Sequence, residues 1–270
     1  MIKLFKSVCF ITFFVFTGAL FLAPLKYAVF AEVFRAQKAL NGYSPAAFFD
    51  FFWDYAAVLY KSGFLEAFVY SLFITIFSTW AIIIFTSMAA WMLVRLNNKF
   101  NTFLYYCFIF SMAVPYPLLM WTSPKTAAFF HLANPFGIIV LYLGFGAGLT
   151  VFLYGTFIKR IPKEIEEAAF MDGCSVRAVF FNVTMPILSP VTMAAIIFNV
   201  LWIWNDYLMP SLIIGQQYKT LPILIQNIAS NPQEINYLPL VLFFSLYMPL
   251  LFFAAFKKNI LKAFSTGIQK

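Results

Sequence analysis

Charged residues are scarce in this sequence. Asp, Glu, Lys and Arg together make up 10% of its 270 residues, against about 25% in an ordinary soluble domain. Hydrophobic residues make up 63%, and the mean hydropathy is +0.86. A folded chain of this composition has too little polar surface to cover itself in water. We therefore exclude a soluble globular domain and predict a protein of the lipid bilayer.

Residues that bind metals, form disulfides or carry out catalysis are few as well. The sequence has one histidine, His131, and three cysteines at unrelated spacings, Cys9, Cys107 and Cys174. They predict neither a disulfide framework nor a metal site, and we expect no cofactor. A membrane enzyme would need paired carboxylates or a nucleophile beside a base, and His131 has no obvious partner. The Walker A sequence is missing too, so we predict no catalytic residue and no ATP hydrolysis by this chain.

Long apolar runs recur along the whole sequence. The hydrocarbon core of a bilayer is about 30 Å thick, which a helix of about 20 apolar residues crosses with its backbone satisfied. Six segments reach this length, at residues 7–30, 67–94, 102–122, 137–158, 187–214 and 237–256. They predict an all-α fold with six transmembrane helices in one membrane domain, residues 1–270. The first run also fits a cleaved signal peptide, but five spans follow it, so we favour an uncleaved first span.

The basic residues predict which side of the membrane each loop occupies. Six spans leave both termini on one side, and that side carries 12 of the 18 Lys and Arg residues, against 6 on the other. Because basic residues accumulate in cytoplasmic loops, we place both termini and the loop at 162–186 in the cytoplasm. This distribution explains the net charge of +8 without a nucleic acid partner.

The loop at 162–186 is polar and patterned, between two apolar runs. Pro162 suits the first turn of a helix, and three glutamates follow it at the positive end of the helix dipole. Gly173 can end that helix in the left-handed conformation, and Ser175 can cap a second helix. The second helix has an apolar face, made of Val176, Val179, Phe180 and Val183, and Pro186 marks the return to the membrane. These features predict a helix, a glycine turn and a second helix, although an amphipathic loop resting on lipid headgroups fits the residues as well.

The same loop resembles the EAA loop of binding-protein-dependent ABC importer permeases. The family pattern is Glu-Ala-Ala, three residues, Gly, nine residues and Ile-x-Leu-Pro. The residues that match it are Glu167, Ala168, Ala169, Gly173 and Pro186, with Val183 and Met185 in the isoleucine and leucine positions. Residues 161–173, IPKEIEEAAFMDG, are close to the carbohydrate type of this family, which includes the smaller permease of the maltose transporter. Further similarity lies in residues 70–96, 204–207, 220–222 and 264–270, and the first 60 residues match only loosely.

The resemblance implies a membrane-spanning subunit of a sugar importer, with the type I ABC importer permease fold. Such a subunit lies in the bacterial cytoplasmic (inner) membrane and pairs with a second permease, two ATPase subunits and an extracytoplasmic sugar-binding protein. The resemblance further implies that the EAA loop docks on the ATPase, whose closure then tilts the spans between inward-facing and outward-facing states. The residues expected in this coupling are Glu166, Glu167, Ala168, Ala169, Asp172, Gly173 and Pro186.

A second group of candidate residues lies in the fifth predicted span. Its members are aromatic residues that can stack on sugar rings and two polar residues in an apolar run: Trp202, Trp204, Asn205, Asp206 and Tyr207. They are the expected substrate path, with an interfacial aromatic belt as the alternative. For Asp206, a structural role near the hydrated outer interface is favoured over contact with the sugar.

The main alternative function is a stand-alone secondary transporter or channel. Ion coupling in such a protein would need buried charges along several spans, whereas Asp206 is the one candidate in this sequence. An ATPase and a binding protein encoded beside this chain would favour the importer over this alternative.

Two local patterns inside the predicted spans concern packing. Three closely spaced glycines, Gly144, Gly146 and Gly148, predict a seam of small residues against another helix. Pro115 and Pro117 predict a bend in the third span.

Overall fold

The computed structural model describes residues 57–249, apart from 58, 97, 216, 233, 235–236, 239–240, 243 and 247–248. The predicted first span, at 7–30, and much of the sixth, at 237–256, lie outside the described residues. The elements of the described part are all helices, as expected. Glu66–Ile223 belongs to one compact unit, and the described residues on either side of it belong to another.

The second predicted span is the long helix α3, Phe64–Arg95. No charged residue lies between Glu66 in its first turn and Arg95 in its last. At about 1.5 Å per residue its 32 residues extend well beyond the thickness of a hydrocarbon core. The charges at both ends therefore lie where a helix leaves the lipid.

The third predicted span, at 102–122, is not one continuous helix. Helix α4 begins at Lys99 after its cap Asn98, whose Oδ1 accepts from the Asn101 N–H at 2.7 Å, and it ends at Ala113. Val114 is extended because the ring of the following Pro115 disfavours the helical conformation there. Two short helices follow, α5 at Tyr116–Met120 and α6 at Ser123–Phe129. The predicted bend is therefore a break.

The fourth predicted span is α7, Pro135–Ile158, capped by Asn134, whose Oδ1 accepts from two backbone N–H groups. The fifth, at 187–214, was predicted too long: α11 covers Ser189–Asn205, the chain breaks, and α12 covers Leu208–Ile213. A further helix, α13, covers Leu221–Ser230.

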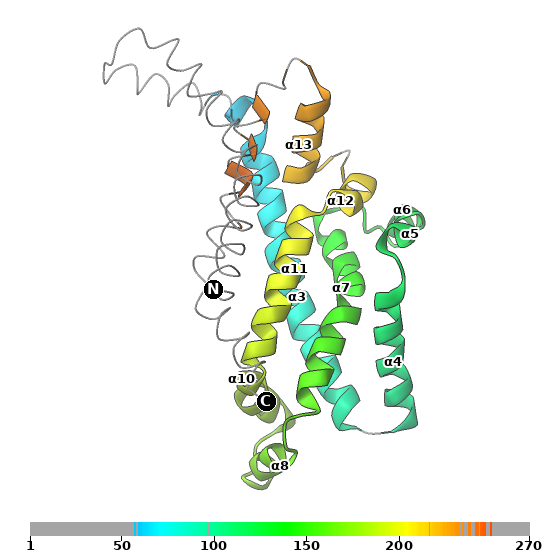
Figure 1. The fold of residues 1–270 in the computed structure, drawn as a ribbon, viewed down its shortest axis with the longest axis vertical. Helices are drawn as coiled ribbons and strands as arrows, with labels where there is room; N and C mark the ends of the chain where they lie inside the picture. The colour runs from blue at the N-terminus through cyan, green and yellow to red at the C-terminus, as the bar shows by residue number, and fades with distance from the viewer. Residues whose placement is uncertain are drawn as a thin grey trace, which may run out of the picture. The chain divides into compact units, whose positions relative to one another are not determined.

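Glycines let α4 approach α7 closely, and Figure 1 shows α7 lying between α4 and α11. A Cβ on Gly148 would lie 2.5 Å from the Ser111 hydroxyl oxygen, and one on Gly155 would lie 2.4 Å from the Tyr105 ring. Gly146 faces α3 instead, and no atom lies within 4 Å of the Cβ position of Gly144. The predicted seam at 144–148 was thus partly wrong, because residues seven apart, 148 and 155, share the face toward α4.

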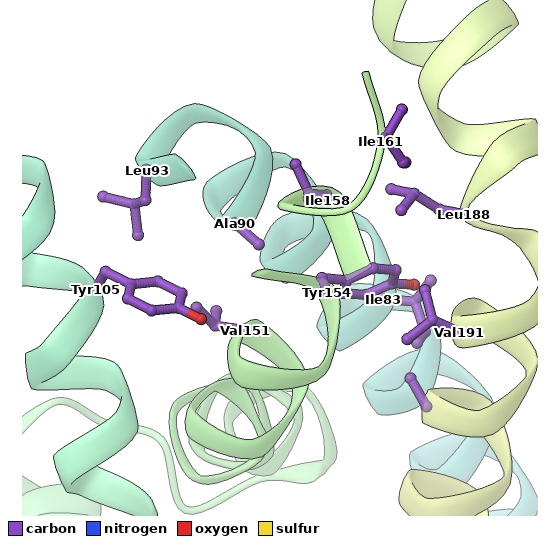
Figure 2. Packing of buried hydrophobic residues seen from close by; sticks show 11 residues of the cluster. Ile83, Ala90, Leu93, Tyr105, Val151, Tyr154, Ile158, Ile161, Leu188 and Val191 are labelled. Carbon is purple, nitrogen blue, oxygen red and sulfur yellow. The ribbon is translucent and has the colours of Figure 1, made fainter. Parts of the chain in front are cut away.

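Two apolar clusters hold these helices together. The first joins α3, α4, α7 and α11 through buried residues, which Figure 2 shows around Tyr154. The Tyr154 hydroxyl donates to Thr192 Oγ1 at 3.0 Å, so its polar end is satisfied within the cluster. The second cluster includes Ile82, Tyr142 and Met209, and joins α3 and α7 to the residues around α12.

Two described helices are long and apolar enough to cross a membrane by themselves, α3 and α7. A third crossing is formed if Val176–Ile187 and Ser189–Asn205, which meet at an angle of 78°, count as one broken span. Many large apolar side chains of the described helices are exposed, among them Trp80, Phe110 and Phe136. Such a surface suits lipid or other apolar subunits. The total of six spans stays a prediction.

Candidate functional site

The polar loop begins with the short helix α8, Glu164–Met171. Three glutamates lie in its first turn, as predicted, where the N-terminal end of the helix dipole favours them. Pro162 was expected inside that turn but precedes it, because Lys163 is the residue at the cap. Figure 1 shows α8 beyond the end of α7.

The turn after α8 has the predicted left-handed glycine. Gly173 has φ +83°, and the backbone N–H of Cys174 donates to Ala169 O while that of Gly173 donates to Phe170 O, both at 3.0 Å. These two bonds are the Schellman ending of a helix, which glycine adopts with little strain. Ser175 then caps the next segment, since its Oγ accepts from the Ala178 N–H at 3.3 Å.

The second arm of the loop is not the regular amphipathic helix that was predicted. After the single α-turn of α9, Val176–Ala178, the chain widens into a π-helix, η1, Val179–Thr184, and then α10, Met185–Ile187. Val179 and Phe180 are buried as expected, but Val176 is 61% exposed, because the π-turns shift the side chains off the spacing of 3.6 residues per turn. Pro186 lies inside α10, and α11 begins after Leu188, so the return to the membrane at Pro186 stays a prediction.

Most of the expected coupling residues lie on the outer surface of the loop. Glu167, Ala168, Asp172, Gly173 and Pro186 are exposed, and Ala169 is half-buried. Two large apolar side chains, Phe170 and Met171, are exposed beside the two alanines, and Met171 is exposed to 88%. An apolar group in this position, next to small residues, is typical of a surface that another protein covers.

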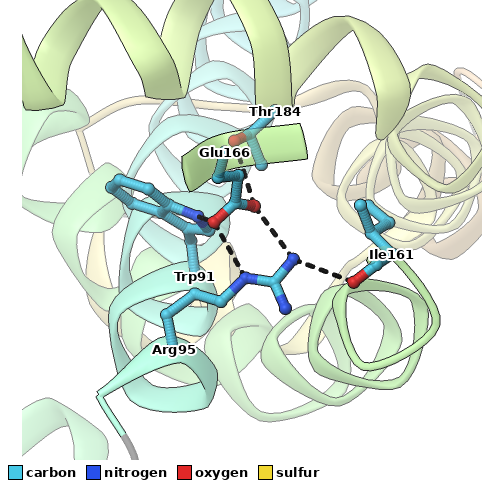
Figure 3. Close-up of polar contacts among 5 residues, drawn as sticks. All are labelled: Trp91, Arg95, Ile161, Glu166 and Thr184. Carbon is cyan, nitrogen blue, oxygen red and sulfur yellow. Dashed lines mark hydrogen bonds and ion pairs between the residues drawn. The ribbon is translucent and has the colours of Figure 1, made fainter. Parts of the chain in front are cut away.

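Glu166 is the exception among these residues. Its side chain points into the loop, is 5% exposed, and forms an ion pair with Arg95 at the end of α3 (Figure 3). Arg95 Nε donates to Oε2 and Nη2 to Oε1, both at 2.9 Å. Sequence analysis missed Arg95, because a basic residue at the end of a span also fits the charge bias of cytoplasmic loops.

The residues of the fifth span form a second polar site, centred on Asp206. Asp206 is 8% exposed. Protein groups, and not the water expected at the outer interface, donate hydrogen bonds to its carboxylate. Oδ2 accepts from the hydroxyls of Tyr116 at 2.5 Å and Tyr142 at 2.9 Å. Oδ1 accepts from the N–H of Leu208, the first residue of α12, at 2.9 Å. Asp206 thus fixes the break between α11 and α12 and orients two tyrosines.

Of the other residues expected on the substrate path, some are buried inside the unit and others lie at its surface. Trp204 is buried and packs edge-on against Phe68 with ring centroids 5.9 Å apart, so it is not free to stack on a ligand. Asn205 donates to Leu201 O at 2.7 Å, and Tyr207 is exposed. Trp202 lines a cavity.

That cavity is an open groove of about 380 Å³ between α4, α5, α7 and α11. Its walls include the rings of Tyr116, Phe145 and Trp202, and Tyr116 lies edge-on to Trp202 with centroids 5.6 Å apart. Ser111 and Asn199 supply polar groups. Sequence analysis missed these partners of Trp202, although Asn199, a lone amide in an apolar run, was a visible signal. No group of metal-ligating side chains occurs in the described part of the chain.

Comparison with known proteins identifies the family. Residues 55–263 match the family model described as "binding-protein-dependent transport system inner membrane component". The chain belongs to this family. The match includes the whole polar loop and every residue that lines the groove.

Curated relatives match over most of the chain. It is 39% identical over 194 residues to the probable starch degradation products transport system permease protein AmyC of Thermoanaerobacterium thermosulfurigenes, covering 67% of this chain and 70% of the relative. It is 28% identical over 268 residues to the multiple sugar-binding transport system permease protein MsmG of Streptococcus mutans, covering 94% and 93%. These relatives are named as transport permeases and not as enzymes.

A solved structure shows the fold. The chain matches the crystal structure of a bacterial ABC transporter involved in the import of the acidic polysaccharide alginate, with a TM-score of 0.75 and 17% identity. The match covers 95% of this chain and 96% of the other. The expected ABC importer permease fold is therefore confirmed.

Proposed function

We propose that this chain is a membrane-spanning subunit of an ATP-driven sugar importer, in which the loop at 162–186 docks on a separate ATPase. Its partners are a second permease, two ATPase subunits and an extracytoplasmic sugar-binding protein. Both termini and the loop lie in the cytoplasm. The chain forms half of the translocation path and hydrolyses no ATP itself.

The observation that carries the coupling proposal is the outer face of α8. Ala168 and Ala169 permit close approach, Phe170 and Met171 offer apolar area, and Glu167 offers a charge to a basic partner. The Gly173 turn presents this face at a fixed angle. The other inner loop of the predicted topology, at 95–101, is too short to provide such a surface.

The test compares large and small substitutions at one position of this face. Ala168→Arg should abolish co-purification of the ATPase, or ATP hydrolysis stimulated by loaded binding protein in proteoliposomes, while the binding protein still docks outside. Ala168→Ser, which stays small, is the matched control and should keep both. Ala169→Arg should act like Ala168→Arg. If the arginine variants retain their ATPase and its full stimulation, the loop is not the coupling element.

Sugar as the substrate class is supported by the names of the relatives and by the groove. The two relatives above are named for starch degradation products and for multiple sugars. The groove combines three aromatic rings with Ser111 and Asn199, and such rings suit the apolar faces of pyranoses while the polar groups suit their hydroxyls. We place Trp202 on the sugar path for this reason.

The groove is tested by a matched pair of tryptophans. Trp202→Ala should raise the sugar concentration for half-maximal uptake about tenfold, the effect of roughly 1.4 kcal/mol of lost contact. Trp80→Ala removes an exposed tryptophan of α3 that does not line the groove, and it should leave this concentration unchanged. Equal effects of the two variants would contradict a sugar contact at Trp202.

A further inference from the structure

Glu166 receives hydrogen bonds from three side chains on two separate segments (Figure 3). Besides the two bonds from Arg95, its Oε2 accepts from Trp91 Nε1 at 3.1 Å and its Oε1 accepts from Thr184 Oγ1 at 3.4 Å. Trp91 and Arg95 belong to the last turns of α3, and Thr184 ends the π-helix η1. Both arms of the loop, α8 and η1, are thus held to the end of α3.

Apolar packing reinforces the same meeting point. The Trp91 ring lies 5.3 Å, centroid to centroid, from the ring of Phe180 in η1, and Phe180 is buried. Arg95 Nη2 also donates to Ile161 O at 3.2 Å, which fastens the segment that enters the loop. Separating α8 from the end of α3 would break the bonds from Trp91 and Arg95 to the buried Glu166 carboxylate.

The backbone on either side of the loop is not one continuous helix with α7 or α11. The helix α7 ends at Ile158 and α8 begins at Glu164, so no continuous helix joins them. On the other side, the segment that ends at Ile187 meets α11 at an angle of 78°. The side-chain bonds of Glu166 connect α8 directly to Arg95 of α3, 71 residues earlier in the sequence.

We propose that Trp91, Arg95, Glu166 and Thr184 form a rigid joint through which α3 follows the movement of the loop. Arg95 and Glu166 are then positioning residues for transport and do not contact the ATPase. The proposal rests on the proposed function, since it names the helix that carries the movement of the docked loop into the membrane. It assigns Glu166 a role separate from that of its exposed neighbour Glu167.

The first test measures distances in a complex that keeps all four residues of the joint. Spin labels are placed at Met92 on α3 and at Glu164 or Asn182, one on each arm of the loop, all three of which are exposed. The three natural cysteines, Cys9, Cys107 and Cys174, are replaced by serine, and sugar uptake by the labelled complex is verified. Both distances should stay the same in the nucleotide-free and the ATP-trapped complex. A change in either distance on trapping overturns the joint.

A reference pair of spin labels distinguishes a failure of the joint from a failure of the proposed coupling function. The distance from Asn182 to a label on the coupling loop of the second permease should shorten on ATP trapping. If it shortens while a distance to Met92 changes, the joint fails and the coupling function stands. If it does not shorten, the coupling function fails, and the joint fails with it.

Variants provide the second test, in the complete complex in proteoliposomes. Glu166→Gln keeps the size of the side chain but removes its charge, and sugar imported per ATP hydrolysed should fall about tenfold, within the range of coupling energies between distant sites. Glu164→Gln, which changes an exposed carboxylate of the same helix outside the docking face, should leave this ratio unchanged. The amount of ATPase that co-purifies should be the same for both. A wild-type ratio in an assembled Glu166→Gln complex overturns the proposal, and if this variant does not assemble, the distances decide.

Discussion

Two carboxylates are buried near opposite ends of α7, and the protein accommodates them in different ways. Glu166, in α8, faces the guanidinium of Arg95, a full opposite charge. Asp206, before α12, accepts from two tyrosine hydroxyls and from backbone N–H groups, and no basic side chain of the described residues pairs with it. Figure 1 shows α8 and α12 at the two ends of this unit.

The difference follows from what each end has to do. A bidentate ion pair fixes both the position and the direction of the two groups, which suits a joint between a loop and a helix. Tyrosine hydroxyls instead satisfy Asp206, and the ring of one of them, Tyr116, also forms part of the groove wall.

The largest effect on stability should come from removing the positive charge that pairs with the buried Glu166 carboxylate. Arg95→Met leaves Glu166 buried without its opposite charge, and it should lower the free energy of unfolding by about 3–5 kcal/mol. The exposed Arg160→Met is the matched control, with an effect within about 0.5 kcal/mol. Thermal unfolding of the purified complex measures both. Similar melting temperatures for the two variants would show that the ion pair contributes no more than a surface charge.

A smaller effect is expected at the other end. Asp206→Asn exchanges charged hydrogen bonds for neutral ones and strands no opposite charge, so the expected loss of stability is about 1–3 kcal/mol. Tyr142→Phe removes one hydrogen bond to this carboxylate and should cost about 1.5–3 kcal/mol. The same unfolding measurement applies. The comparison between the two ends is wrong if Asp206→Asn destabilises the protein more than Arg95→Met does.

The features that could be predicted from the sequence are those decided by neighbouring residues. The bilayer class follows from composition, and the turn at Gly173 and the cap at Ser175 follow from the chemistry of a few consecutive residues. The break before Pro115 was visible too, as a bend, because proline restricts the residue that precedes it.

The features that were missed depend on residues far apart in the sequence. Arg95 and Glu166 are 71 residues apart, and Tyr116 and Asp206 are 90 apart, so no local spacing brings them together. The π-helix η1 was missed because its six residues have an ordinary helical pattern, and we have no local reason for its wider turns. Glu166 and Glu167 show the same limit: adjacent and chemically identical, they differ only in which one faces Trp91 and Arg95.

The smallest effects should come from two glycines that both have open space around them. No atom lies within 4 Å of the Cβ position of either Gly173 or Gly144, so an added methyl group meets nothing in either place. Their backbones differ, because Gly173 has φ +83° whereas Gly144 lies inside the helix α7. Gly173→Ala should therefore lower the free energy of unfolding by about 1–2 kcal/mol, the cost of the left-handed conformation for a residue with a Cβ.

Gly144→Ala should do the opposite and stabilise the protein by about 0.5–1 kcal/mol, since alanine loses less backbone entropy in a helix. If Gly→Ala lowers the melting temperature at Gly173 and raises it at Gly144, the backbone conformation of Gly173, and not the space around it, explains why the turn needs glycine. Because the Schellman bonds of Gly173 persist in the alanine variant, uptake should fall far less than in Glu166→Gln. A larger loss of transport at Gly173 than at Glu166 would mean that the turn, and not the ion pair with α3, is what holds the loop in its working position.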